Sequence, residues 1–506
     1  MKILLSEQVR ELDLKTISEG HASGFELMER AGKGAAIEIN RFIKTSYPSV
    51  NTVIILAGKG NNGGDGFVVA RYLSKWGFKV KVCLIAKIDS LKGDAAEHYK
   101  KIPNTVNCQF CENLNLSNLQ NTLIIDALLG TGLKGAPDGK FADWINSVNS
   151  SFLPTVSLDI PSGLNSDTGK AYIPCIKANM TITFGVPKRG LFIENGLTHT
   201  GILRFVDIGI APGLIEQYES TLNMLTDREA LMLLPRHPQN AHKFSRGHLA
   251  VIAGSGSFTG APSLTSLSAA FSAAGFITLL YPEKCEIRNI KSSIVERKLP
   301  SENGIFSYFS MTPDFFRTVE KADAICVGPG LTASDEIIPM INFLWNLEKK
   351  ILFDADALNI IAKFTPSKRR YDAVLTPHEG EFKRLLSAYK ISSDMDRFSL
   401  AQKLAELIGV VVVLKGPRTV IVSPGKKIYV NPTGSVALAS AGTGDVLSGI
   451  IASLCAQGLD CFNASILGTF IHGRLSEISG KDFLTSDKLV ELLAELKHNE
   501  IFFDNR

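Results

Sequence analysis

The chain has 506 residues, too long for one ordinary hydrophobic core and long enough for two α/β domains. Its formal net charge of +4 is small for this length, and the lack of a concentrated basic run argues against a nucleic-acid-binding surface. The first residues do not have the pattern of a secretory signal, and no apolar run reaches the length of a membrane span. We therefore expect a cytoplasmic protein with neither nucleic acid nor membrane as a partner.

Helical periodicity opens the chain over residues 6–42, and a break rich in glycine and serine near residues 20–24 predicts two helices there. Strand-like and helix-like segments then alternate, which is typical of a parallel sheet covered by helices on both faces. In this half we expect a helix over residues 67–76 and strands over residues 52–57, 79–86, 123–126, 155–159, 180–184 and 203–207.

The alternation lapses between residues 210 and 234, where several prolines interrupt the pattern. We place the domain boundary around residues 218–226, so that the predicted domains cover residues 1–220 and 226–506. The alternation then restarts, with expected strands at residues 248–253, 276–281, 324–327, 350–353, 373–375 and 410–415, a hairpin formed by residues 419–422 and 427–430, and helices at residues 263–274, 446–456 and 466–478. The predicted fold class is α/β in both domains.

Two glycine-rich segments of different kinds lie far apart in the chain, at residues 58–66 and 441–445. Each stands between a strand-like run and a helix-like run. Glycine lets the backbone turn tightly and bring its N–H groups close to an anion, and the following helix adds the positive end of its dipole. The pattern therefore predicts two nucleotide-handling sites, one in each domain.

Polar residues gather at the carboxyl ends of three predicted strands in the first half, namely residues 61–65, Asp126 and Asp159. Ligands of an open parallel sheet bind outside these ends, so the three motifs are expected to meet in one crevice. The structural alternative for Asp126 and Asp159 is helix capping or turn formation, and Asp65 could cap a helix that begins at Gly66.

Residues 58–63 also satisfy the dinucleotide pattern G-x-G-x-x-G. The acidic residue expected about twenty positions further on, for the ribose hydroxyls, is not evident after the strand over residues 79–85. An ordinary hydride-transfer dehydrogenase is therefore disfavoured. The single C-x-x-C, Cys108 and Cys111, has no second pair to complete a tetrahedral zinc site, so we interpret both as ordinary thiols.

The first half resembles the NAD(P)H-hydrate epimerase family, because residues 27–32, 60–66, 126–133 and 159–165 match its motifs in order. The resemblance implies a Rossmann-like three-layer α/β/α domain that interconverts the R and S forms of hydrated NADH or NADPH at the hydroxylated carbon. It implies that the substrate's phosphates, ribose and ring contact Asn61, Asn62, Gly63, Gly64, Asp65, Gly130, Thr131, Gly132, Leu133, Lys134, Gly135, Ala136 and Asp159.

The same resemblance implies that Asn62, Asp126 and Ser162 supply oxygen atoms to a potassium ion. Hard oxygen ligands suit a hard cation, so the residue chemistry agrees with that assignment. Asp159 is implied to contact the reacting ring, and a carboxylate in that position is a sensible proton carrier. We therefore expect Asp159 to be catalytic.

In the second half, residues 442–444 are expected at the amino terminus of a helix, where their N–H groups can stabilise a phosphoryl group in transfer. Asp445 at the helix start can accept a proton from a substrate hydroxyl, although a capping role alone is the alternative. Carboxylates at Asp354 and Asp356 follow one strand, and His378 follows another. Lys415 to Thr419 follow a third strand, with two cations suited to phosphate. A histidine alone would more often be structural, but in this setting we expect a ligand contact.

These motifs resemble the ADP- or ATP-dependent NAD(P)H-hydrate dehydratase branch of the ribokinase-like superfamily, with further matches at residues 242–248, 253–262, 327–331 and 431–434. The resemblance implies that the hydrate hydroxyl takes a phosphoryl group and then leaves as phosphate, which departs more easily than hydroxide. It implies Asp445 as the base and magnesium on the nucleotide phosphates. The implied hydrate contacts are Ala261, Gly330, His378 and Asp445, and the implied adenine-nucleotide contacts are Lys415, Gly416, Pro417, Arg418, Thr419 and Gly444.

Two departures from that family leave the nucleotide preference open, since Ser435 stands where asparagine is more common and Glu379 where proline is more common. The fusion of the two domains favours ADP. Two other functions stay possible at this point: a ribokinase-like small-molecule kinase, and a first half that acts as a nucleotide-binding interaction module without catalysis. We also expect a homo-oligomer, for which the amphipathic amino-terminal helices offer a dimer face, with core packing as their alternative role.

Overall fold

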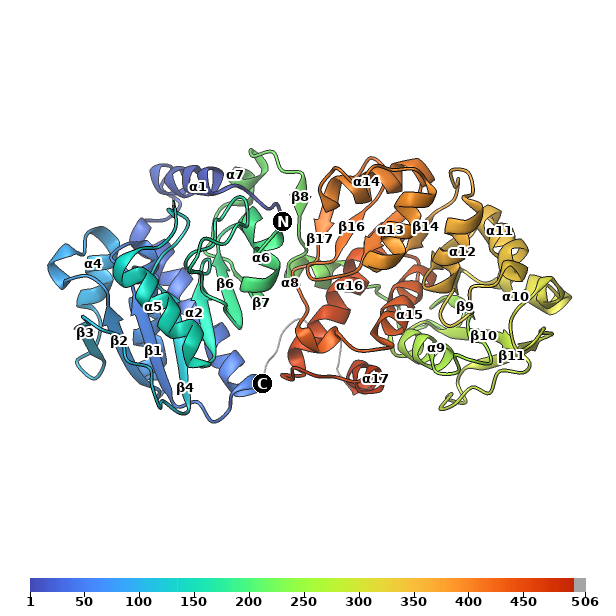
Figure 1. The fold of residues 1–506 in the computed structure, drawn as a ribbon, viewed down its shortest axis with the longest axis horizontal. Helices are drawn as coiled ribbons and strands as arrows, with labels where there is room; N and C mark the ends of the chain where they lie inside the picture. The colour runs from blue at the N-terminus through green and yellow to red at the C-terminus, as the bar shows by residue number, and fades with distance from the viewer. Residues whose placement is uncertain (134, 496–506) are drawn as a thin grey trace. The chain divides into compact units, whose positions relative to one another are not determined.

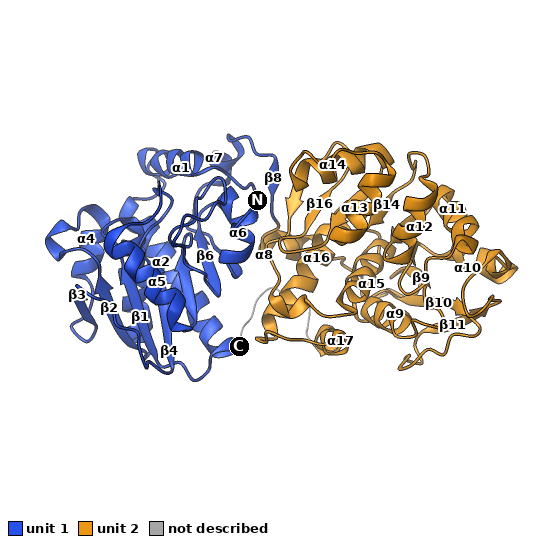
Figure 2. Ribbon diagram, in the orientation of Figure 1, with its two compact units in different colours: residues 1–224 blue, residues 225–506 orange. Residues whose placement is uncertain are grey.

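The computed structural model describes residues 1–133 and 135–495, and the chain divides into two compact units, residues 1–224 and 225–506 (Figures 1 and 2). Lys134, which the sequence places in the first site, lies outside the described residues. Both units consist of a mainly parallel sheet with helices, so the predicted α/β class is confirmed. None of the described helices is both long and apolar enough to cross a membrane.

Unit 1 contains a seven-stranded sheet in the order β3-β2-β1-β4-β5-β6-β7, with every neighbouring pair parallel. The strand order reverses at β1, which pairs with β2 on one side and with β4 on the other. This reversal opens a crevice at the carboxyl ends of β1 and β4, where ligands of doubly wound sheets bind. The seven strands are β1 (Thr52–Ala57), β2 (Lys79–Leu84), β3 (Asn107–Phe110), β4 (Thr122–Ala127), β5 (Thr155–Leu158), β6 (Met180–Phe184) and β7 (Ile202–Val206). The short β8 (Leu222–Asn223) is not part of this sheet.

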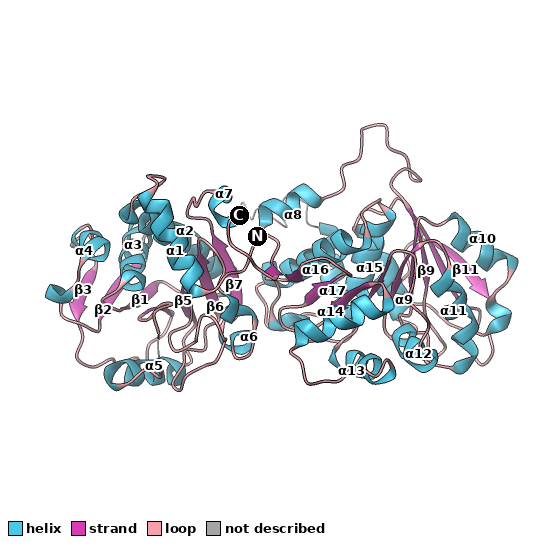
Figure 3. Cartoon of the chain, turned by 90° about the horizontal axis from the view of Figure 1, so that it is seen from above, coloured by secondary structure: helices cyan, strands magenta, loops and turns pink. Residues whose placement is uncertain are grey.

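Alternate residues of β1 enter different cores, as expected for a strand buried on both faces. Val53 and Ile55 pack with residues of α2 and α3, whereas Ile54 and Leu56 pack with α5 residues such as Trp144. Figure 3 shows α3 and α5 on opposite sides of the sheet, which confirms the predicted three layers. The helices of unit 1 are α1 (Ser6–Ser18), α2 (Gly24–Ser46), α3 (Asn61–Lys75), α4 (Gly93–Lys100), α5 (Gly139–Ser151), α6 (Gly196–His199) and α7 (Pro212–Glu216).

Helix α3 begins at Asn61, six residues before the start predicted at Phe67. The glycines of this segment misled the prediction, because glycine weakens an isolated helix. None of the glycines from Gly58 to Gly66 has a positive φ. They are needed for close packing instead, since a Cβ on Gly63 would lie 2.1 Å from the Gly58 carbonyl oxygen and one on Gly64 would lie 2.5 Å from the Met28 sulfur.

Unit 2 has the strand order β11-β10-β9-β12-β13-β14-β15-β16-β17. Neighbouring strands are parallel from β11 to β15, and the last two pairings are antiparallel. The predicted hairpin is therefore confirmed as β16 and β17, with Gly425 at a φ of 64° in its turn. The strands are β9 (His248–Ile252), β10 (Phe276–Pro282), β11 (Val295–Leu299), β12 (Ala324–Val327), β13 (Lys350–Phe353), β14 (Ala373–Leu375), β15 (Val411–Leu414), β16 (Val420–Val422) and β17 (Ile428–Val430).

Helices α9, α15 and α16 cover one face of this sheet and share a continuous apolar core with Leu249 and Val251 of β9. Helix α15 is buried along most of its length, and it begins at Thr443, directly after the second glycine-rich turn. The helices of unit 2 are α8 (Asp227–Leu233), α9 (Ala261–Phe271), α10 (Pro313–Lys321), α11 (Ile338–Asn346), α12 (Asp356–Phe364), α13 (Glu379–Ala388), α14 (Arg397–Ile408), α15 (Thr443–Ala456), α16 (Cys461–Ile478) and α17 (Ser486–Glu495).

Candidate functional site

The carboxyl ends of β4 and β5 are joined by a buried network around Asp126, which is 0% exposed. Its Oδ1 accepts a hydrogen bond from the Ser162 hydroxyl at 2.6 Å, and its Oδ2 accepts bonds from the Ser162 N–H at 2.9 Å and the Ser157 hydroxyl at 2.8 Å. Burial raises the pKa of Asp126, and the bonds from Ser162 and Ser157 oppose that rise. The carboxyl group thus links two strand ends at the predicted crevice.

Asn62 and Leu129 extend this network to the first turn of α3. The Asn62 Nδ2 donates to the Leu129 carbonyl oxygen at 2.9 Å, and the Leu129 N–H donates to the Ser162 hydroxyl at 2.9 Å. The Asn62 Oδ1 is buried and has no hydrogen-bond donor among residues 1–133 and 135–495. A buried amide oxygen without a donor is costly, and a cation bound there would remove that cost. The structure thus brings together the predicted potassium ligands Asn62, Asp126 and Ser162.

The first turn of α3 packs directly on the loop that follows β4. A Cβ on Gly58 would lie 2.1 Å from the Leu128 carbonyl oxygen, and one on Gly130 would lie 3.6 Å from the Asn62 Cβ. Asn61 to Asp65 and Gly130 therefore lie at the same edge of the sheet, as the sequence predicts. The loop continues toward α5, and a Cβ added to either of its next two described glycines would meet no neighbouring heavy atom within 4 Å. These later loop residues are Thr131, Gly132, Leu133, Gly135 and Ala136.

We expect Gly63→Ala to destabilise unit 1, because the new methyl group would overlap the Gly58 carbonyl oxygen at 2.1 Å. Overpacking of this kind typically lowers the free energy of unfolding by about 1–3 kcal/mol. Urea denaturation of the full chain measures the change. Gly60→Ala is the matched control, since a Cβ there meets nothing within 4 Å. Equal stability of the two variants would contradict the packing role of Gly63.

Asp159 follows β5 in a left-handed backbone conformation, with a φ of 63°. Its Oδ1 accepts an ion-paired hydrogen bond of 2.5 Å from the Nζ of Lys188. Lys188 is only 2% exposed, and its ammonium also donates to the Phe184 carbonyl oxygen at 2.9 Å and contacts the Thr183 hydroxyl at 3.3 Å. A buried ammonium held in this way fixes the orientation of the Asp159 carboxylate.

Asp65 lies in the fifth position of α3, and the N-cap of that helix is Gly60. The proposed alternative, that Asp65 caps a helix starting at Gly66, is therefore wrong. The Asp65 side chain is buried, and burial raises its pKa well above the usual value; the nearby charge of Asp159 raises it further, and Lys188 opposes the rise. Asp65 consequently stands in the same electrostatic environment as Asp159, and its protonated form is favoured by burial and by that neighbouring charge.

The second glycine-rich turn lies at the start of α15 in unit 2. Gly442 is the N-cap with a φ of 84°, and Asp445 is the third residue of the helix. The Asp445 carboxyl has no hydrogen-bond partner within the described part of the chain, so capping does not account for it. The Nε2 of His472 lies 2.9 Å from the Thr443 carbonyl oxygen. Burial lowers the pKa of His472 to about 4, so an uncharged imidazole ring supports the turn.

Lys415 and Asp354 form a buried ion pair beside this turn. The Lys415 Nζ lies 2.7 Å from the Asp354 Oδ1 and 3.5 Å from the position of a Cβ on Gly444. The Asp354 Oδ2 accepts a bond of 2.7 Å from the Ser448 hydroxyl of α15. Burial and the charge of Asp354 raise the pKa of Asp445 to about 7, and Lys415 partly opposes them. Asp445 therefore changes its charge near neutral pH, as a general base must.

His378 is both a helix cap and a candidate ligand contact. Its Nδ1 accepts bonds from the N–H groups of Gly380 at 2.9 Å and Glu381 at 3.4 Å, at the start of α13. This arrangement leaves the Nε2 as the protonated nitrogen of a neutral ring. The His378 side chain is 56% exposed, and burial followed by the charge of Lys415 lowers its pKa. The structural and ligand-binding interpretations of His378 are thus compatible.

The loop from Lys415 to Thr419 differs from the expectation in one respect. Arg418 is buried, and its guanidinium donates to the Pro432 carbonyl oxygen at 2.7 Å. A contact between Arg418 and a nucleotide would therefore use its backbone and not its charge. The Nη1 of Arg397, at the start of α14, instead donates to the Pro417 carbonyl oxygen at 3.1 Å, and thus places a second cation beside Gly416.

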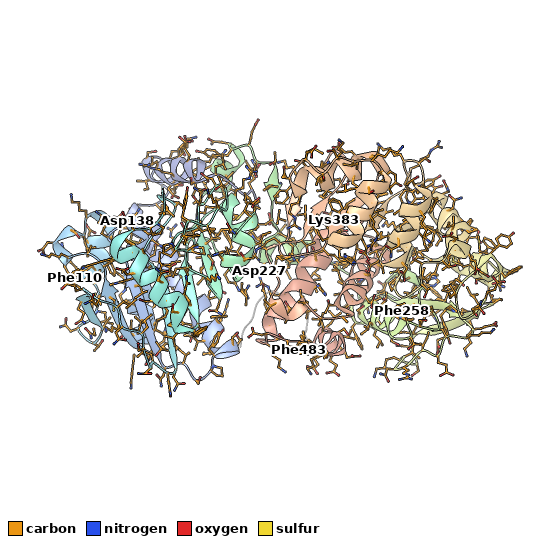
Figure 4. All side chains as sticks on the ribbon, in the orientation of Figure 1. Phe110, Asp138, Asp227, Phe258, Lys383 and Phe483 are labelled. Atoms are coloured by element: carbon orange, nitrogen blue, oxygen red, sulfur yellow. The ribbon has the colours of Figure 1, made fainter. Side chains whose placement is uncertain are left out.

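Ala261 and Gly330 come together at the carboxyl edge of β9 and β12. A Cβ on Gly330 would lie 3.1 Å from the Ala261 Cβ and 2.9 Å from the Phe258 Cβ. Phe258 is 53% exposed in the loop before α9 and is labelled in Figure 4. Sequence reasoning missed this aromatic side chain, although it lies within the matched segment 253–262.

Lys188 and Arg397 were also absent from the predicted sites. Lys188 follows the predicted strand 180–184 by four residues, so the rule that located Asp126 and Asp159 at strand ends could have found it. No local pattern marks Arg397, because α14 reaches the loop after β15 only through tertiary packing. The thiol of Cys108 has a pKa raised to about 11 by burial, in keeping with an ordinary protonated cysteine.

Comparison with known proteins covers both units. The family described as NAD(P)H-hydrate dehydratase matches residues 249–498, and the family described as YjeF-related protein N-terminus matches residues 24–190. A solved ADP/ATP-dependent NAD(P)H-hydrate dehydratase from Bacillus subtilis, co-crystallised with ATP and Mg²⁺, is 28% identical with a TM-score of 0.45, covering 53% of this chain and 95% of its own.

Two full-length relatives are both named bifunctional NAD(P)H-hydrate repair enzyme Nnr. The one from Moorella thermoacetica is 37% identical over 94% of this chain and 91% of its own length. The one from Escherichia coli is 33% identical over 92% of this chain and 87% of its own length. The chain therefore belongs to the family of bifunctional NAD(P)H-hydrate repair enzymes.

Proposed function

We propose that residues 1–220 epimerise hydrated NADH and NADPH, and that residues 226–506 dehydrate the S form back to the reduced nucleotide with ADP, releasing AMP and phosphate. The observation that carries the second activity is the placement of Asp445, whose carboxyl lies at the start of α15 with a pKa of about 7 beside the Lys415–Asp354 pair. The fusion places on one chain an isomer-exchanging activity and the activity that consumes one isomer.

In the dehydratase, Asp445 accepts the proton of the hydrate hydroxyl as that oxygen attacks the terminal phosphoryl group of the nucleotide. The N–H groups of Gly442 to Gly444 face the charge that develops on the phosphoryl oxygens, and Lys415 adds a cation beside Gly444. The phosphorylated carbon then loses phosphate, which leaves more readily than hydroxide. The neighbouring ring carbon gives up a proton to water, and the electron pair of that C–H bond restores the double bond of the reduced nicotinamide.

Magnesium fits this site as a companion of the nucleotide. Within the described residues there is no cluster of three or more histidine, cysteine, aspartate or glutamate side chains suited to hold a metal. Magnesium commonly uses one or two carboxylates together with substrate phosphates, and it would neutralise phosphate charge here. The Asp354 carboxylate already accepts hydrogen bonds from Lys415 and Ser448. The phosphates would therefore supply most of the oxygen ligands of the magnesium ion.

In the epimerase, the Asn61 to Asp65 turn and the Gly130 to Ala136 loop would hold the substrate's phosphates and ribose, with Asp159 on the reacting ring. Asn62, Asp126 and Ser162 would hold potassium, which supplies positive charge beside the bound phosphates. The buried Asn62 Oδ1 supports this assignment, because it lacks a donor within residues 1–133 and 135–495.

Potassium is expected to raise the thermal unfolding midpoint of unit 1 relative to tetramethylammonium at equal ionic strength. A ligand that binds only the folded state at about 100 times its Kd adds roughly 2.7 kcal/mol of stability. Differential scanning calorimetry of the full chain in the two chloride salts measures the difference. Asn62→Ala removes the orphaned oxygen and should abolish it. If potassium does not raise the midpoint of the wild type, or raises that of Asn62→Ala equally, potassium does not bind at Asn62, Asp126 and Ser162.

The proposed function is tested with a mixture of R and S NADH hydrate, ADP and magnesium. Complete recovery of NADH, with one AMP and one phosphate released per molecule, is the expected result. Replacing ADP by ATP tests the nucleotide preference. A stable phosphorylated hydrate instead of released phosphate would indicate a small-molecule kinase, and recovery of only the S fraction would remove the epimerase from the proposal.

A further inference from the structure

Asp13 is an acidic residue on the inward side of a surface helix. Helix α1 buries Val9, Leu12 and Thr16, and Asp13 continues the same stripe at the spacing i, i+3, i+4 and i+7. Asp13 is half-buried, and its carboxyl has no hydrogen bond or ion pair among residues 1–133 and 135–495. A carboxylate on the packed face of a helix with no hydrogen-bond partner is unfavourable, so its presence there calls for an explanation.

The segment before α1 is hydrogen-bonded to the residues on either side of Lys188. The Leu4 N–H donates to the Pro187 carbonyl oxygen at 3.0 Å, and the Arg189 N–H donates to the Leu4 carbonyl oxygen at 3.0 Å. The Ser6 hydroxyl and N–H both donate to the Asp167 carboxylate, at 2.7 and 2.6 Å. Helix α1 is thus anchored at its start beside the strand end that carries the Asp159–Lys188 pair.

The electrostatics place the Asp13 carboxyl in the same cluster. Burial raises its pKa to about 6, Lys188 lowers it, and Asp159 raises it. The charge of Asp13 in turn raises the pKa of Asp65, after burial and Asp159. Helix α7 contacts α1, and its charged residue, Glu216, forms an ion pair with Lys2. Three carboxyl groups therefore share a single ammonium, which disfavours the ionisation of all three together.

We propose that Asp13 is the proton acceptor of the epimerase site, working opposite Asp65 as the proton donor across the ion pair of Asp159 and Lys188. This inference rests on the proposed epimerase function. Exchange of the isomers breaks the carbon–oxygen bond of the hydrate and re-forms it on the other face. Asp65 gives its proton to the departing hydroxyl, which leaves as water, and an incoming water gives one proton to Asp13 as its oxygen bonds to the carbon.

One proton enters and one leaves in this sequence, so the step balances without an oxidant or reductant. For the reverse isomer the two carboxyl groups exchange roles. Asp13 is half-buried, whereas Asp65 is buried, so Asp13 is the member of the pair that exchanges its proton with solvent. Asp159, held by Lys188, stabilises the positive charge that develops on the ring when the oxygen departs.

The test is the pH dependence of kcat/KM for isomer exchange by the full chain. In the wild type, kcat/KM should rise with pH through about 6, because Asp13 accepts a proton only when ionised. Asp13→Asn should lower kcat by about 100-fold or more and remove this acidic limb, since proton transfer contributes about 10²–10⁴-fold. Asp13→Glu should restore an acidic limb together with part of the rate.

Glu11→Gln is the matched control, because it removes one negative charge from the exposed side of the same helix. It should change neither the rate nor the pH profile. A wild type without isomer exchange would overturn the proposed function itself. An active wild type, with Asp13→Asn keeping both the rate and the acidic limb, would leave the epimerase intact and overturn the role of Asp13. A lower rate with an unchanged profile would also overturn it, as a structural effect.

Discussion

Asp445→Asn is expected to lower the kcat of hydrate dehydration by about 10²–10⁴-fold while leaving isomer exchange unchanged. Asparagine keeps the size of the side chain but cannot accept the hydroxyl proton, and general-base catalysis contributes about that factor. The measurement is NADH recovery from pure S hydrate with ADP. Isomer exchange by the other unit reports on the integrity of the same preparation.

The pH profile of the wild type sharpens this prediction. Burial and the charge of Asp354 hold the pKa of Asp445 at about 7, so the fraction of ionised base grows as the pH rises through 7. The kcat/KM of dehydration should therefore increase with pH across that value. Asp487→Asn, on the exposed first turn of α17, is the matched control and should keep both rate and profile. If Asp445→Asn keeps the wild-type dehydration rate, another group accepts the proton of the hydrate hydroxyl.

Asp159→Asn is expected to lower the rate of isomer exchange by about 10²–10³-fold, because the charge that develops on the ring loses its stabilising carboxylate, and to stall NADH recovery once the S fraction is consumed. Asparagine tolerates the left-handed backbone at φ 63°, so the change acts on the charge and not on the chain. It also leaves the buried ammonium of Lys188 without its partner, and an uncompensated buried charge costs about 3–5 kcal/mol.

The double variant Asp159→Asn with Lys188→Met separates these two effects. Removing both charges should recover much of the lost stability, because a buried ion pair can be replaced by apolar groups at little cost. The double variant should still lack isomer exchange. Asp143→Asn, on the exposed side of α5, controls for the loss of one charge. Isomer exchange by the stable double variant would exclude Asp159 and Lys188 from the chemistry.

The predicted strands agree closely with the structure because each is a short apolar run between turn residues. The expected strands at residues 52–57, 350–353 and 373–375 have the bounds of β1, β13 and β14. Parallel strands buried on both faces require such runs, so the local sequence carries the signal. The rule that ligands bind beyond strand ends then located Asp126 and the Asn61 to Asp65 turn at one edge.

The start of α3 was not predictable in the same way. Glycine is a poor helix former, so residues 61–66 look like a loop when they are considered locally. In the folded chain, Gly63 and Gly64 are held in the helix because only glycine fits against the Gly58 carbonyl oxygen and the Met28 side chain. Tertiary packing overrides the local preference at this point.

The amino-acid sequence by itself determined the α/β class, the succession of strands and the family, since these depend on apolar periodicity and on motifs that are contiguous in the chain. Only the tertiary structure decided which distant side chains lie near one another: Lys188 pairs with Asp159, the charges of both act on the pKa of Asp13, and Arg397 lies beside the loop in which Arg418 turns inward. The physical reason is that charge–charge interactions and burial depend on distances in space, which residue spacing along the chain does not encode.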